Sequence, residues 1–185
     1  MAEFIQDNPE LVERLRHPGT VREAFGQVIA RYSEPLYRLI RRMVQSHEDA
    51  NDLLQNTFMK AWSNIEHFRG DARLGTWLYK IAVNETLSYL DKERRRRGLS
   101  LDDQEAAIIN TIEADTDIDG DALAQKLRKA IAMLPEKQRL VFNMRYYDEM
   151  RYDDISAVLG TSVGALKASY HLAVKKIEQF FSDDD

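Results

Sequence analysis

The sequence predicts an all-α protein in which two small helical domains are joined by an acidic linker, the C-terminal domain being a helix-turn-helix. Apolar residues recur every three or four positions along most of the chain, which is the period of an amphipathic helix. No stretch alternates apolar and polar residues for long enough to indicate a strand. An acidic stretch, residues 99–121, separates the two helical patterns and is expected to be the linker.

The N-terminal domain, residues 1–98, begins with an apolar pattern that covers residues 21–43. Pro35 lies inside this pattern, and because proline lacks a backbone N–H we expect it to break or kink the helix. The pattern therefore predicts one helix that ends near Tyr32 and a second that ends near Met43.

Two further helices are expected in this domain. One runs from about Glu48 to Ile65 and ends before the turn-rich stretch HFRGDARLG, residues 67–75. The other begins near Thr76, which can cap it, and ends at Gly98, a residue type that favours the end of a helix.

The C-terminal domain, residues 122–185, starts with one more amphipathic helix, and Pro135 opens the next. A short helix with the sequence YDDISAVL then ends at Gly160. A long amphipathic helix follows almost at once, with Thr161 or Ser162 as its cap. A short helix, a tight turn containing glycine and a second amphipathic helix form a helix-turn-helix.

The composition narrows the classes of function. The 185 residues are 44% hydrophobic and 31% charged and include no cysteine, which excludes thiolate nucleophiles, iron-sulfur clusters and cysteine-ligated zinc. No apolar run approaches the roughly 18 residues of a membrane span. The N-terminus carries acids where a signal peptide would carry basic residues. A cytoplasmic protein without membrane insertion is therefore expected.

The charge is unevenly distributed. The net charge is −5, yet residues 99–121 hold eight acids and no Lys or Arg, and residues 182–185 hold three more acids. The rest of the chain holds 26 basic and 20 acidic residues. Two mildly basic modules favour a nucleic-acid partner, although a solvated acidic loop between two helical domains would give the same segmentation.

The patterns that mark common catalytic sites are absent from the sequence. The four histidines are scattered, and neither HExxH, a P-loop nor GxGxxG occurs, so we expect no enzyme, cofactor or metal. Asp49 and Asp52 lie one helical turn apart and could form an acid-base or metal pair. With Glu48 beside them and no histidine nearby, a solvated acidic face or a docking surface is the favoured interpretation.

Two segments carry groups suited to nucleic acid. The second helix of the helix-turn-helix leaves serine, lysine and histidine side chains on its polar face, as a major-groove helix does, although a surface helix of a plain bundle can look the same. Arg94 to Arg97 exceed what the helix dipole needs and indicate phosphate contacts. Phe68 and Trp77 flank the polar loop and could enclose an unstacked base or belong to the core.

Four stretches together resemble one family: EDANDLLQNTFMKAW, FRGDARLGTWLYKIAVNETLSYL followed by RRRR, LPEKQRLVF, and YDDISAVLGTSVGALKASYHLAVKKI. They are similar to the extracytoplasmic-function (ECF) group of bacterial RNA polymerase sigma factors of the sigma-70 family, and the resemblance covers about residues 20–181. It implies that residues 1–98 bind the polymerase core and the promoter −10 element. It implies that residues 122–185 read the −35 element.

Patterns and resemblance together give three sets of site residues. The set expected to dock on the clamp helices of the largest polymerase subunit is Asp49, Asp52, Leu53, Gln55 and Phe58. The set expected at the −10 element is Phe68, Arg69, Gly70, Asp71, Ala72, Arg73, Trp77, Lys80, Asn84, Arg94 and Arg95. The set expected at the −35 element is Thr161, Ser162, Gly164, Lys167, Ser169, His171, Lys175 and Lys176.

The implied activity is binding, with polymerase core and promoter DNA as partners and no catalysis by this chain. The resemblance also implies an anti-sigma protein as a further partner. Two other classes stay open at this stage. A freestanding, dimeric helix-turn-helix regulator would explain the C-terminal half but not residues 48–98, and a helical adaptor would explain the acidic linker and little else.

Overall fold

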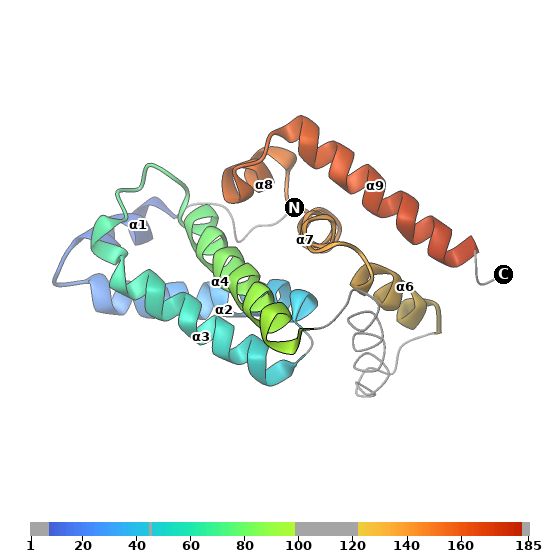
Figure 1. Cartoon of the computed structure of the whole chain (residues 1–185). Helices are drawn as coiled ribbons and strands as arrows, with labels where there is room; N and C mark the ends of the chain where they lie inside the picture. The colour runs from blue at the N-terminus through green and yellow to red at the C-terminus, as the bar shows by residue number, and fades with distance from the viewer. Residues whose placement is uncertain (1–7, 45, 99–121, 183–185) are drawn as a thin grey trace.

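The computed structural model describes residues 8–44, 46–98 and 122–182, and within these residues it is helical without a strand, which confirms the all-α prediction (Figure 1). The acidic segment at 99–121 lies outside the described residues. The helices of the N-terminal half are α1 (Pro9–Arg16), α2 (Val21–Met43), α3 (His47–Ser63) and α4 (Leu74–Arg97), with the 3₁₀ turn η2 (Ile65–His67) between α3 and α4. The helices of the C-terminal half are α6 (Ala122–Ala132), α7 (Glu136–Tyr146), α8 (Tyr152–Leu159) and α9 (Val163–Ser182).

Helix α1 was not predicted, although local signals for it exist. The Asn8 side chain accepts a hydrogen bond from the Leu11 backbone N–H at 3.2 Å, and Pro9 occupies the first helical position. Asparagine at the cap and proline at the first position are both typical of a helix start. Leu11 and Leu15 are buried, so packing holds this short helix against the rest of the N-terminal half.

Of the two effects expected at Pro35, a break or a kink, the break is wrong, because α2 runs unbroken from Val21 to Met43. A proline inside a helix costs about 3 kcal/mol. Burying one leucine side chain contributes about 1.5–3 kcal/mol. Leu36 and Leu39, on the C-terminal side of the proline, are 0% and 2% exposed, so the packing of this half of α2 outweighs the lost backbone bond.

The start of α4 also differs from the prediction. The helix begins at Leu74, and Thr76 lies buried in its first turn instead of capping it. The buried Leu78 and Tyr79 then place α4 in the core, where it packs against α2 and α3. Gly98 ends the helix in the left-handed conformation with φ +57°, as the sequence predicted.

The C-terminal half contains the predicted helix-turn-helix, formed by α8 and α9. Gly160 ends α8 with φ +65°, a conformation that glycine adopts without strain, and α9 starts three residues later. Behind these helices, α7 contributes the Phe142 ring, whose centroid lies 5.6 Å from that of Tyr170 in a stacked arrangement. The aromatic contact fixes α9 on α7.

One hydrophobic cluster spans the two halves, and a second lies within the C-terminal half, between α6, α7 and α9. Val141 and Met144 of α7 and Ile155 of α8 belong to the same buried cluster as the N-terminal helices. Figure 1 shows α7 and α8 beside the N-terminal half, consistent with the contacts of α7 with α2 and of α8 with α4. The sequence did not indicate this contact, since it joins residues about a hundred positions apart.

Candidate nucleic-acid interface

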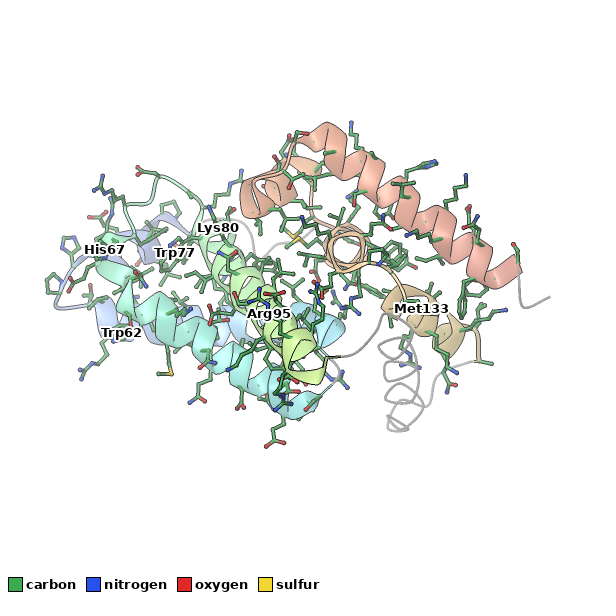
Figure 2. The ribbon with its side chains drawn as sticks, viewed as in Figure 1. Trp62, His67, Trp77, Lys80, Arg95 and Met133 are labelled. Carbon is green, nitrogen blue, oxygen red and sulfur yellow. The ribbon has the colours of Figure 1, made fainter. Side chains whose placement is uncertain are left out.

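A hollow of about 310 Å³ opens on the surface of the N-terminal half, between the end of α3, η2 and the first half of α4. Figure 2 shows His67 and Trp77, two of its residues, at this end of the molecule. Its walls combine an indole ring, an imidazole ring, two amides, an oppositely charged pair and an aliphatic side chain. The lining residues are Lys60, Asn64, His67, Trp77, Ile81, Asn84 and Glu85.

The local fold explains why these residues meet. Helix α3 ends at Ser63, and the Asn64 amide Nδ2 donates to the Lys60 carbonyl at 2.8 Å, which closes the last turn. The chain turns through η2 and returns as α4, which packs against α3. Along α4, Trp77, Ile81 and Asn84 follow one another at spacings of four and three, so they share one face of the helix.

The two aromatic residues that flank the loop have different roles. Phe68 is 6% exposed and belongs to the core, whereas Trp77 is half-buried and lines the hollow. The two ring centroids lie 5.0 Å apart, so Phe68 supports the inner side of the indole. Of the two roles that the sequence left open, Phe68 is therefore a core residue, and Trp77 lines the hollow.

An ion pair crosses the wall of the hollow. The Lys60 ammonium on α3 contacts Oε1 of Glu85 on α4, and the Lys60 side chain is 59% exposed whereas that of Glu85 is 16% exposed. Asn84, next to Glu85 in the chain, is exposed. An amide can donate and accept hydrogen bonds, and a carboxylate only accepts. The hollow can therefore stack a flat ring on Trp77 and form hydrogen bonds with its edge.

The loop before α4 is exposed and is held from two sides. The Arg16 guanidinium of α1 donates a hydrogen bond to the Arg69 carbonyl. Arg73 forms an ion pair with Asp154 of α8 at 3.3 Å. The other members of the predicted loop set, Gly70, Asp71 and Ala72, are also exposed.

The basic residues of α4 differ in their surroundings. Lys80, labelled in Figure 2, is exposed close to Trp77 along the helix. Arg94 forms an ion pair with Glu136 of α7 at 2.8 Å, and Arg95 pairs with Asp91. A phosphate group would therefore have to replace these carboxylates before Arg94 or Arg95 could bind it.

Two of the five residues expected to dock on polymerase are buried. Leu53 and Phe58 are 5% and 8% exposed, and in this conformation their side chains pack α3 onto the core. Asp52 and Gln55 are exposed on the outer face of α3, and Asp49 is half-buried in its first turn. Only these three polar side chains of the set can meet a partner in this conformation.

The polar face of α9 is open to solvent. Of the predicted −35 set, Ser162, Gly164, Lys167, His171, Lys175 and Lys176 are exposed, and Thr161 and Ser169 are half-buried. Of the two residues predicted to cap α9, Ser162 forms the capping hydrogen bond: its Oγ accepts from the Ala165 N–H at 3.3 Å. Leu166 and Ala173 hold the opposite face against the domain.

Three ionisable groups with shifted pKa values, Asp148, Tyr79 and Arg139, lie where the two halves meet. Burial raises the pKa of Asp148 above its usual value, and Arg42, whose Nη1 lies 2.8 Å from Oδ1, opposes this shift. Burial, with a smaller effect of Asp148, raises the pKa of the Tyr79 hydroxyl far above its usual range. Burial lowers the pKa of Arg139, which donates to the Met43 carbonyl at 3.3 Å.

The described residues contain neither a grouped metal site nor a membrane-spanning helix. No three histidine, aspartate or glutamate side chains among them are grouped so that they could hold a metal ion. In the same part of the chain, no helix has both the length and the apolar character that a membrane crossing requires.

Comparisons with known proteins cover both halves. The family model for Sigma-70 region 2 matches residues 28–96, and that for Sigma-70, region 4 matches residues 124–177. The chain is 32% identical over 186 residues to the ECF RNA polymerase sigma-E factor of Haemophilus influenzae, with 96% of each chain covered. It is 31% identical over 193 residues to that of Escherichia coli K12, covering 96% of this chain and 95% of the other.

Two solved structures share the fold. The sigma factor RpoE of Bartonella quintana, in complex with the anti-sigma factor NepR, aligns with a TM-score of 0.65 at 23% identity, covering 87% of this chain and 98% of that one. CnrH, in complex with the cytosolic domain of CnrY, aligns with a TM-score of 0.70 at 22% identity, covering 95% and 97%.

Proposed function

The chain belongs to the ECF group of the sigma-70 family of bacterial RNA polymerase sigma factors, and from this premise we propose how its residues direct the polymerase to promoters. Members of this family are transcription initiation factors that bind rather than catalyse. We assign the −10 element and the polymerase core to residues 1–98, and the −35 element to residues 122–185. The observation that carries the proposal is the hollow between α3 and α4, which combines Trp77 and Asn84 of the predicted −10 set.

The hollow is suited to one unstacked base of the non-template strand. Taking a base out of the duplex costs a few kcal/mol. Stacking on an aromatic side chain contributes about 1–3 kcal/mol per base, so the Trp77 indole can offset much of that cost. Asn84 then supplies hydrogen bonds to the base edge, and the exposed Lys80 and Arg69 lie on the same half to attract phosphates.

The exposed face of α9 is suited to the major groove of the −35 element. In a helix-turn-helix, residues near the start of the second helix reach base edges. Ser162 caps α9, Lys167 and His171 lie in its first half, and all three side chains are exposed. Lys175 and Lys176 lie one to two turns further on, where they can contact phosphates and fix the register of the helix.

The polymerase is proposed to dock on α3 through the exposed Asp52 and Gln55, with Asp49 at the edge. Polymerase core and promoter DNA are thus the two partners. An anti-sigma protein is proposed as a third, by analogy with the relative that is described in complex with NepR. Because bacterial transcription takes place in the cytoplasm, the proposed function also places the chain there.

The test is transcription with purified parts. Promoter DNA is first selected from a randomised pool by its binding to core polymerase mixed with the chain. Core polymerase is then incubated on this DNA with and without the chain. We expect specific transcripts only when both are present, and a footprint over two unlike elements. The rival, a dimeric regulator, predicts a footprint of the chain alone over two symmetrical half-sites and no dependence on core; that result would overturn the proposal.

A further inference from the structure

We propose that Glu85 determines which base the hollow accepts, and that it favours bases carrying an exocyclic amino group over thymine. The inference rests on the proposed role of the hollow as the site of the unstacked −10 base. Glu85 was not among the residues expected from the sequence, since it belongs to the site only through the fold.

The carboxylate of Glu85 is held in a fixed position. Its side chain is 16% exposed, and its Oε1 contacts the Lys60 ammonium, which comes from the other wall of the hollow. Among the described residues, no hydrogen bond is formed by Oε2. The neighbouring residue Asn84 lines the same hollow and has an amide oxygen of its own. Two adjacent positions on α4 thus supply hydrogen-bond acceptors.

This arrangement discriminates between bases. A carboxylate has no hydrogen to donate, so it can bind only the N–H groups of a base. Adenine, cytosine and guanine each carry an amino group with two N–H bonds, which can serve Glu85 and Asn84 together. Thymine has no amino group, and its single N3–H lies between the carbonyl oxygens O2 and O4. It can therefore donate to only one of the two acceptors, and it turns a carbonyl oxygen toward the other without a hydrogen between them.

Lys60 makes the Glu85 carboxylate compatible with DNA binding at the hollow. An unpaired carboxylate beside a DNA strand would repel the phosphates, and the ammonium of Lys60 cancels that charge. Lys60 is therefore a positioning residue for Glu85: it fixes Oε1 and leaves Oε2 for the ligand.

The experiment uses holoenzyme assembled from core polymerase and the full chain. The probes are forked DNAs with a −10 element selected by the wild-type holoenzyme, in which each single-stranded position in turn is A, C, G or T. Binding is compared for the wild type, Glu85→Gln, Lys60→Met and Asn84→Ala. Glu66→Gln makes the same change on an exposed acid of η2 that does not line the hollow. Thermal melting monitored by circular dichroism checks that each variant folds.

At one position of the fork, we expect the wild type and Glu66→Gln to bind thymine about ten-fold more weakly than the amino-bearing bases, a typical discrimination for one good base contact. Glu85→Gln, whose amide can donate to O4, should reduce this difference to two-fold or less. Lys60→Met should weaken binding of all four bases.

Two results would overturn different parts of the argument. If Asn84→Ala binds every fork as tightly as the wild type, the hollow does not hold the base and the proposed −10 role itself fails. If Asn84→Ala weakens binding while Glu85→Gln leaves the ranking of the bases unchanged, the hollow holds the base but Glu85 does not select it.

Discussion

Individual side chains in this protein divide into those that pack in the core and those that are exposed and proposed to contact a partner, and the division follows helix face more closely than residue type. Phe68 and Trp77 are both aromatic and nine residues apart, yet only Trp77 has a face in the hollow. Leu53 and Asp52 are neighbours, yet only Asp52 is exposed. Sequence patterns identify such neighbourhoods, whereas the helix face to which each residue belongs decides its role.

Asp148 provides a test at the level of one ionisable group. Because burial raises its pKa in the native state, the native chain binds more protons than the unfolded chain between the usual value of 3.8 and the raised value. Its contribution to the free energy of unfolding should therefore fall as pH rises through this window and stay constant above it. Asp148→Asn cannot titrate, so urea denaturation of both proteins at several pH values isolates this contribution. A wild-type advantage that grows with pH would show that Arg42 dominates over burial.

Base reading and phosphate contact can also be separated by single substitutions. Lys176→Ala should weaken binding of the holoenzyme to all promoters about equally and lower the slope of log K against log salt concentration by about 0.9, since one phosphate contact is lost. Asn84→Ala should change tolerance at one −10 position and leave the slope unchanged. Equilibrium binding at four or more salt concentrations measures both effects. The opposite pattern, an altered base preference for Lys176→Ala with a constant slope, contradicts these assignments.

At the level of elements, the sequence predicted helix ends that depend on local signals and did not predict a helix that depends on long-range packing. The end of α4 at Gly98 and the start of α9 after Ser162 were predicted, because a single residue type at the end of an apolar pattern is a local signal. The continuity of α2 through Pro35 was not predicted, because it depends on burial of residues on both sides. The pattern showed those residues as apolar but did not show how completely the other helices would cover them.

Helix α3 can be tested as a docking element. Replacing Asp52 and Gln55 together by Ala should abolish or strongly weaken core binding while stability changes by no more than about 0.5 kcal/mol per site, as is usual for exposed positions. The matched control replaces Glu178 and Gln179, an exposed acid and amide near the end of α9, by Ala. Pull-down with core polymerase measures binding, and far-ultraviolet circular dichroism measures helix content. Wild-type core affinity in the α3 variant would remove this face from the interface.

At the level of the whole molecule, the important contacts join distant parts of the chain. Some of them form the hollow, and others hold α7 and α8 against α2 and α4, an arrangement that we call the closed shape. Lys60 and Glu85 are 25 residues apart, and Arg42 and Asp148 are 106 residues apart. A single sequence carries no signal for such pairs, because any exposed lysine and glutamate look alike without the fold. The family resemblance predicted a site at Asn84 and the loop before α4. In the structure Asn84 lines the hollow, and the packing of α3 on α4 supplies the opposite wall.

The closed shape also limits what the chain can reach. A compact chain of 185 residues has a radius of gyration of about 16 Å, hence a diameter of about 40 Å. Two promoter elements about two helical turns apart are separated by roughly 70 Å. Under the proposed assignments, the hollow and α9 cannot both reach their promoter elements while one hydrophobic core joins the two halves. The proposed function therefore requires α7 and α8 to separate from α2 and α4 on polymerase, which would expose apolar residues such as Met144 and break the Arg42–Asp148 pair.

Holding the chain closed should therefore block promoter use. Arg94 lies 3.9 Å from Asp91 and 2.8 Å from Glu136, so these two acids face each other across the contact between the halves. The chain has no cysteine of its own, and Asp91→Cys with Glu136→Cys can be linked by a short bismaleimide with a reducible spacer. Because α3 stays exposed, the linked chain should still bind core but give no promoter-specific transcript, and reduction of the spacer should restore transcription. Each single-cysteine variant, treated alike, controls for modification. Full transcription by the linked chain would mean that the two halves need not separate, and the difference between 40 and 70 Å would then have to be met by bending the DNA.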